Sequence, residues 1–103
     1  MKLTWIACAA LLASATTAMA QDKEALYVRS LAATCANCHG THGRTADGSS
    51  VPALAGMPRD YLAGQMKAFK SGARPATIMH QLSKGYSDAQ IDQIAAYFAS
   101  QKK

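Results

Sequence analysis

The segment that most constrains this chain is Cys35-Ala36-Asn37-Cys38-His39, in which two thiols and an imidazole stand close together. On a helix, at about 100° per residue, Cys38 lies about 60° to one side of Cys35 and His39 about 40° to the other. All three side chains would then leave the helix within a wedge of about 100°, toward one flat object. A haem fits this arrangement, because its vinyl groups take up two thiols and its iron binds an imidazole. The motif predicts one c-type haem, attached covalently through Cys35 and Cys38, with His39 as an iron ligand.

Three other kinds of site could contain this motif. A thioredoxin-like thiol pair is typical of a βαβ context, and this chain offers no convincing strand. A zinc site needs four ligands. Besides the motif itself, only His42 and His80 could supply further nitrogen ligands. The neighbours Cys38 and His39 cannot easily both reach one tetrahedral ion. A disulfide across two residues closes too small a loop to add much stability.

Residues 1–20 read as a signal peptide. A positive start at Lys2 is followed by an apolar stretch and by Ala18-Met19-Ala20, which has the form of a cleavage site. The alternative is an uncleaved membrane anchor, since the segment approaches the ~20 residues needed to span a bilayer. Its small second half, with Ser and Thr, argues against an anchor. We therefore expect a periplasmic protein that is cleaved after Ala20, with Cys8 leaving in the peptide.

Residues 21–103 then form one small domain, and domains of this size often need a cofactor or cross-link to be stable. Removal of Lys2 lowers the formal net charge from +5 to +4. This modest excess suits docking to an acidic protein surface. The basic residues are not interleaved with aromatic ones, and no nucleic-acid motif is present. We expect no nucleic-acid binding and no stable membrane insertion after cleavage.

Local patterns predict helices and loops along this domain. Residues 22–38 read as a helix capped by Asp22, and the Gly-rich residues 40–56 as a loop. Residues 58–72 read as a helix that begins at Pro58 and ends at Gly72. Its apolar face is formed by Leu62, Met66, Phe69 and Ala73. Residues 73–85 allow a helical turn or two.

The last helix is the clearest. Ser87 and Gln90 form a capping box ahead of an apolar stripe at helical spacing. The stripe consists of Ile91, Ile94, Ala95 and Phe98. No segment alternates with a period of two over a strand's length. The predicted class is all-α, with three main helices and short helical turns.

The chain resembles the class I cytochromes c over nearly all of residues 22–101. The segments "PALAGMPRDYLAGQMKAFKSG" and "ATIMHQLSKGYSDAQIDQIAAYFASQ" are similar to single-haem periplasmic cytochromes, and especially to the cytochrome subunit of flavocytochrome c sulfide dehydrogenase. The resemblance implies the class I cytochrome c fold and electron transfer by iron cycling between Fe(II) and Fe(III). It implies redox proteins of the periplasm or inner membrane as partners, a flavoprotein sulfide dehydrogenase subunit among them.

The resemblance also implies further site residues. Met79 stands where the family carries its second axial ligand, with Met57 and Met66 as competitors. A loop proline of the family accepts a hydrogen bond from the proximal histidine through its carbonyl, and Pro52 matches that place. His42 and His80 could also bind iron, although an exposed polar role is the simpler interpretation. The first helix lacks the glycine that the family often places at a close helix crossing, so an alanine such as Ala25 or Ala32 would have to serve.

The sequence allows alternatives for one surface and for the function. Lys67, Lys70 and Arg74 share one sector of the helix, which is either a docking surface beside the haem edge or an ordinary solvated face. The protein is a diffusible carrier, a haem subunit of an enzyme complex or, if Met79 does not hold the iron, a gas-binding or peroxidatic protein.

Overall fold

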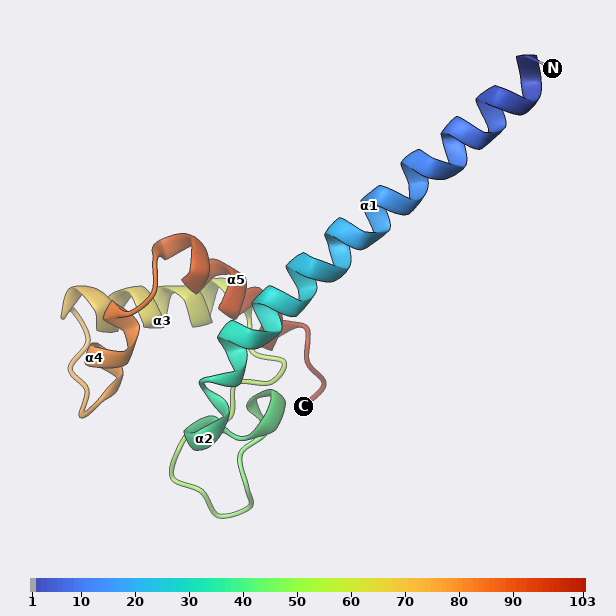
Figure 1. Ribbon diagram of the computed structural model, residues 1–103. Coiled ribbons are helices and arrows are strands. Elements are labelled where there is room, and N and C mark those ends of the chain that lie inside the picture. Colours follow the sequence, from blue (N-terminus) through green and yellow to red (C-terminus); the bar gives the residue numbers. More distant parts are fainter. Residues whose placement is uncertain (1) are drawn as a thin grey trace.

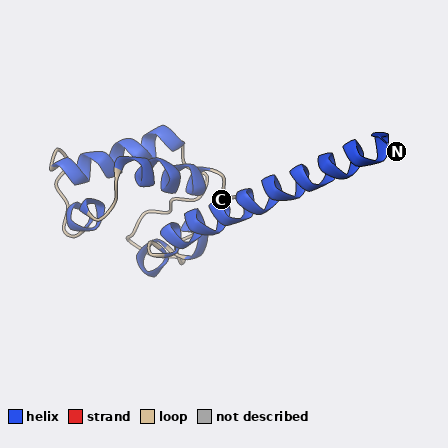
Figure 2. Ribbon diagram, turned by 45° about the horizontal axis from the view of Figure 1, so that its top comes forward, coloured by secondary structure: helices blue, strands red, loops and turns tan. Residues whose placement is uncertain are grey.

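The computed structural model describes residues 2–103, with side chains from Thr17 onward, so Met1 and the side chain of Cys8 lie outside the described part. Its elements are α1 (Lys2–Ala33), α2 (Ala36–His39), the 3-10 turn η1 (Thr41–Gly43), α3 (Arg59–Ser71), α4 (Met79–Lys84) and α5 (Asp88–Ala99). Residues 2–103 contain no strand (Figure 2). The all-α class is confirmed, with three main helices and three short turns.

Helix α1 is longer than predicted at one end and shorter at the other. It runs unbroken through Asp22, so the prediction that Asp22 caps this helix is wrong for the full-length chain. The reason is local: residues 9–20 are rich in alanine and contain no proline or glycine to stop a helix. Figure 1 shows this first part of α1 projecting away from the other helices. That residues 1–20 are cleaved stays a prediction.

None of the helices among the described residues combines the length and the apolar character needed to cross a membrane.

The core lies where α5 packs against α1 on one side and α3 on the other. It consists of Ala32, Leu62, Ala63, Ile91, Ile94, Ala95 and Phe98. All four members of the predicted α5 stripe are therefore buried. On α3, Leu62 is buried while Met66 and Phe69 are partly buried. The placement of Ala73 on this face was wrong, because Gly72 ends α3 in a left-handed conformation (φ 83°) and leaves Ala73 exposed.

The predicted capping box at the start of α5 is present. The backbone amide of Gln90 donates to Ser87 Oγ at 3.1 Å, and the backbone amide of Ser87 donates to Gln90 Oε1 at 2.9 Å. The Gln90 side chain also uses its other end, because Nε2 donates to the Tyr27 hydroxyl of α1 at 2.9 Å. One side chain thus caps α5 and ties it to α1.

The small residue at the crossing of α1 and α5 is Ala32, which is 3% exposed, whereas Ala25 is exposed. We predict that Ala32→Leu lowers the free energy of unfolding by about 1–3 kcal/mol, because extra methylenes in a packed core force the helices apart. Thermal denaturation of the haem-loaded protein measures this. Ala25→Leu is the matched control and should change stability by less than about 0.5 kcal/mol. Equal effects at both positions would show that Ala32 is not the crossing residue.

Candidate haem-binding site

The Cys35–His39 motif forms its own helical turn. Helix α1 ends at Ala33 and not at residue 38 as predicted, and α2 begins after Cys35, whose backbone is helical (φ −80°, ψ −17°). The His39 amide donates to the Cys35 carbonyl at 2.9 Å, which closes the turn. Both cysteines are free thiols, Cys35 half-buried and Cys38 exposed. The angular relation derived for one helical turn therefore applies within residues 35–39, despite the break from α1.

The tautomer of His39 follows from its hydrogen bond. Its Nδ1 lies 2.7 Å from the Pro52 carbonyl oxygen, and the residue is 9% exposed. A carbonyl only accepts, so Nδ1 carries the proton and donates. The lone pair of Nε2 is then free for a metal, which is the arrangement of a histidine ligand fixed by an outer partner.

The loop that carries Pro52 is held against the motif by backbone contacts. Gly40 turns the chain directly after His39, with φ 80° and ψ 163°, a region that only glycine adopts readily. The Gly43 carbonyl then accepts from the amides of Leu54 at 2.8 Å and Ala55 at 3.2 Å. These contacts bring the Pro52 carbonyl to His39 from a loop that sequence patterns predicted only as irregular.

His42 is tied into the fold, contrary to the simple expectation of an exposed polar residue. It has a positive φ of 55°, and its Nδ1 lies 2.5 Å from the Tyr97 hydroxyl of α5. His80 is half-buried, and its Nδ1 is buried without a hydrogen-bond partner among the described residues. No sequence pattern pointed to Tyr97 as the partner of His42, because the two lie far apart in the chain.

The three candidate methionines of residues 21–103 differ in their surroundings. Met57 and Met66 are partly buried and pack against the core cluster. Met79 is half-buried, opens α4 and is not among the residues that pack against that cluster. Core packing accounts for Met57 and Met66, which leaves Met79 as the thioether with no core role.

Burial raises the pKa of the Cys35 thiol above its ordinary value of 9.0. The contact with the Thr34 hydroxyl opposes this rise, and the neighbouring Cys38 adds to it. Because the thiolate is the form that oxidises and exchanges, the raised pKa keeps Cys35 as a less reactive thiol at neutral pH.

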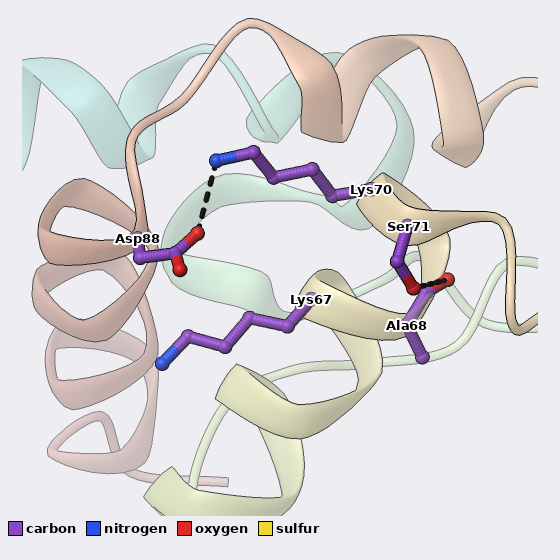
Figure 3. Close-up of a pocket in the computed structure, with 5 residues that line it drawn as sticks. All are labelled: Lys67, Ala68, Lys70, Ser71 and Asp88. Atoms are coloured by element: carbon purple, nitrogen blue, oxygen red, sulfur yellow. Dashed lines mark hydrogen bonds and ion pairs between the residues drawn. The ribbon is translucent and has the colours of Figure 1, made fainter.

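The basic sector of α3 faces carboxylates of α5. Lys67 Nζ lies 2.8 Å from Asp92 and Lys70 Nζ 2.9 Å from Asp88. Figure 3 shows Lys70 and Asp88 facing each other across a shallow hollow, with Ser71 and Ala68 on its rim and none of the motif residues in it. Arg74 lies beyond Gly72, which ends α3, so its placement on this helix was wrong; its guanidinium lies over the Phe69 ring, 4.6 Å from the centroid. The two lysines are neutralised locally, which favours the solvated-face interpretation over a docking surface built on them.

These ion pairs predict a pH dependence. The hydrogen bond and charge of Lys70 hold the pKa of Asp88 below its ordinary value of 3.8. A carboxyl group whose pKa is lowered by folding stabilises the fold at pH values above its ordinary pKa. This contribution is lost as the pH falls through the lowered pKa of the folded state. We expect Asp88→Asn to lower the Tm slightly at neutral pH, with the difference from wild type vanishing in acid below pH 3.8.

The control for this prediction is Asp60→Asn. Asp60 also lies in the first turn of its helix, but it has no ion-pair partner among the described residues. It corrects for the interaction of a carboxylate with the helix dipole. If both substitutions change the Tm equally at every pH, the Lys70 pair contributes nothing.

The observed donor set fits a covalently attached haem. Two free thiols and an imidazole with an available Nε2 lie on one helical turn, and the imidazole is fixed from behind by a carbonyl. An all-helical domain with this site is a class I cytochrome c. In agreement, residues 27–102 match the family described as Cytochrome c, so the chain belongs to the cytochrome c family and carries covalent c-type haem with its iron.

Several characterised proteins are similar to this chain. The cytochrome subunit of sulfide dehydrogenase from Chlorobaculum tepidum is 37% identical over 73 residues, which are 71% of this chain and 64% of that protein. Cytochrome c-554(548) from Halomonas halodenitrificans is 39% identical over 72 residues, covering 67% of this chain and 86% of the relative. The thiosulfate dehydrogenase electron acceptor from Thiomonas intermedia is 39% identical over 71 residues, but these are 69% of this chain and only 33% of that protein.

A solved structure supports the same fold. Cytochrome c4 from Acidithiobacillus ferrooxidans superimposes with a TM-score of 0.60 and 38% identity, covering 64% of this chain and 37% of that one. The chain thus corresponds to about a third of some relatives and to most of others. The class I cytochrome c fold is confirmed.

Proposed function

We propose that this protein is a periplasmic electron-transfer protein with one covalent haem, whose iron is held by His39 and Met79. The observation that carries the proposal is the hydrogen bond from His39 Nδ1 to the Pro52 carbonyl at 2.7 Å, because it fixes the imidazole and leaves Nε2 for the iron. The haem supplies a single electron by the Fe(II)/Fe(III) couple. Cys35 and Cys38 hold it covalently on the turn that carries His39.

Met79 is proposed as the second axial ligand because core packing accounts for the two other methionines. Its element α4 and the motif turn α2 both lie below α3 in Figures 1 and 2. A thioether raises the reduction potential and occupies the last coordination position. With that position filled, the protein exchanges electrons without binding a substrate to the metal, so we propose that it is not itself a catalyst.

The test is a redox titration of the exported protein, with visible spectra of the reduced form before and after addition of carbon monoxide. We expect reversible one-electron behaviour and low-spin bands that carbon monoxide does not change. A protein that binds carbon monoxide readily has an open sixth position, and the gas-binding or peroxidatic alternative then replaces the carrier.

A second candidate is a haem subunit of an enzyme complex. The similarity to the cytochrome subunit of sulfide dehydrogenase favours it, with a flavoprotein as the partner chain. Stable, stoichiometric co-elution with a flavin-containing chain at moderate salt would support the subunit role. Elution as a free protein that reduces and oxidises several partners would support the carrier. Export through residues 1–20 is part of both proposals, and sequencing of the mature N-terminus checks the cleavage after Ala20.

A further inference from the structure

Tyr86 joins two parts of the chain that lie far apart in sequence. It follows α4 closely, since the Gly85 amide donates to the Leu82 carbonyl at 3.1 Å and the Tyr86 amide to the Ser83 carbonyl at 3.3 Å. Its ring is half-buried and packs against the core cluster. Its hydroxyl lies 2.6 Å from Thr34 Oγ1, directly before the motif turn. One side chain therefore bridges the segment that begins at Met79 and the segment that ends at His39.

The direction of this hydrogen bond follows from the contact of Thr34 with the Leu31 carbonyl. The Thr34 hydroxyl donates to the Leu31 carbonyl at 2.8 Å, which uses its only proton. Thr34 Oγ1 must then accept from Tyr86, so the tyrosine hydroxyl is the donor. Thr34 Oγ1 also lies 3.9 Å from Cys35 Sγ, a long contact to a weak donor, so the tyrosine hydroxyl supplies the short hydrogen bond to this acceptor.

The path from Tyr86 to the proposed iron ligands is short on both sides. Thr34 is bonded to Cys35, and the Cys35 carbonyl accepts from the His39 amide at 2.9 Å. In the other direction, α4 (Met79–Lys84) is a helix of six residues that ends two residues before Tyr86. The sequence carries no sign of the contact, since Thr34 and Tyr86 belong to no shared motif.

We propose that the Tyr86 hydroxyl is a positioning group, which holds the Met79 segment against the turn that carries His39 and so keeps the thioether on the iron. This inference rests on the proposed His39/Met79 ligation. Its test is the affinity of free imidazole for the ferric haem, because imidazole binds only when the weaker methionine leaves. Loss of one net hydrogen bond then raises this affinity in Tyr86→Phe by about two- to ten-fold.

The variants separate positioning from general stability. Thr34→Val removes the acceptor together with the contacts of Thr34 to Leu31 and Cys35, so it should raise imidazole affinity at least as much as Tyr86→Phe does. Adding Tyr86→Phe to Thr34→Val should give no further rise, because the Tyr86 contact is then already lost. Thr34→Ser keeps the acceptor and should stay at the wild-type affinity. Tyr27→Phe is the matched control. It deletes a different tyrosine hydroxyl contact, the one that Gln90 Nε2 of α5 makes with Tyr27 of α1 at 2.9 Å, and it leaves the proposed ligand segments unchanged.

An unchanged affinity in Tyr86→Phe would overturn the proposal. An equal rise in Tyr27→Phe would do the same, because the effect would then be a general loosening of the α1–α5 contact. A failure of the ligand assignment itself gives a different result: the wild-type ferric protein then lacks the methionine-to-iron charge-transfer band, and Met79→Ala leaves its imidazole affinity unchanged.

Discussion

Met79→Ala is expected to convert a haem that does not bind carbon monoxide into one that binds it stoichiometrically. Alanine offers no donor atom, so the sixth position of the reduced iron becomes open to small ligands. Loss of the soft thioether also lowers the reduction potential, because the thioether favours the reduced state of the iron. Visible spectra with and without carbon monoxide, together with a redox titration, measure both changes.

The controls are Met57→Ala and Met66→Ala. Both side chains are partly buried and pack against the core, so each substitution should cost about 0.5–3 kcal/mol of stability and leave the haem insensitive to carbon monoxide. The opposite pattern, with carbon monoxide binding in Met57→Ala or Met66→Ala alone, would move the sixth ligand to that methionine. This comparison separates ligation from packing among three residues of one type.

Gly40→Ala is expected to be the most destabilising single methyl addition in the loop of residues 40–56 that follows His39. A Cβ at Gly40 would lie 1.8 Å from the Arg44 carbonyl oxygen and 3.0 Å from the Thr45 Cα, both backbone atoms, at a φ of 80°. Neither neighbour can move without opening the turn that follows His39. We expect a loss of at least about 3 kcal/mol, from strained backbone and overpacking together, and a strong fall in the yield of haem-loaded protein.

The matched control is Gly48→Ala. Gly48 has nearly the same φ of 77°, but a Cβ there meets nothing within 4 Å. It should lose only the conformational part, about 1–2 kcal/mol, and keep its haem. Comparing thermal unfolding and the haem-to-protein absorbance ratio of the two variants isolates the clash with Arg44. Similar losses in both would mean that the turn after His39 can relax around an added methyl group.

Local signals in the sequence were sufficient for the helices and the haem motif. The capping box of Ser87 and Gln90 and the stripe from Ile91 to Phe98 act within a few residues, so spacing alone predicts both the start and the buried face of α5. The spacing of Cys35, Cys38 and His39 likewise determines their relation on one turn. Local signals placed the end of α3 correctly at Gly72, but they misplaced the end of α1, which stops at Ala33, and they put Ala73 on a helix face that the chain has already left.

The tertiary structure alone decided which distant residues meet. It selected Ala32 over Ala25 at the helix crossing and paired Lys67 and Lys70 with carboxylates of α5. It brought the Tyr86 hydroxyl to Thr34 and the Tyr97 hydroxyl to His42. Such contacts depend on how helices cross and on where loops close, and no periodicity along the chain records those distances. The haem-attachment motif is therefore specified locally, whereas the contacts around it arise only when α1 and α3 pack against α5 and α4 packs against α3.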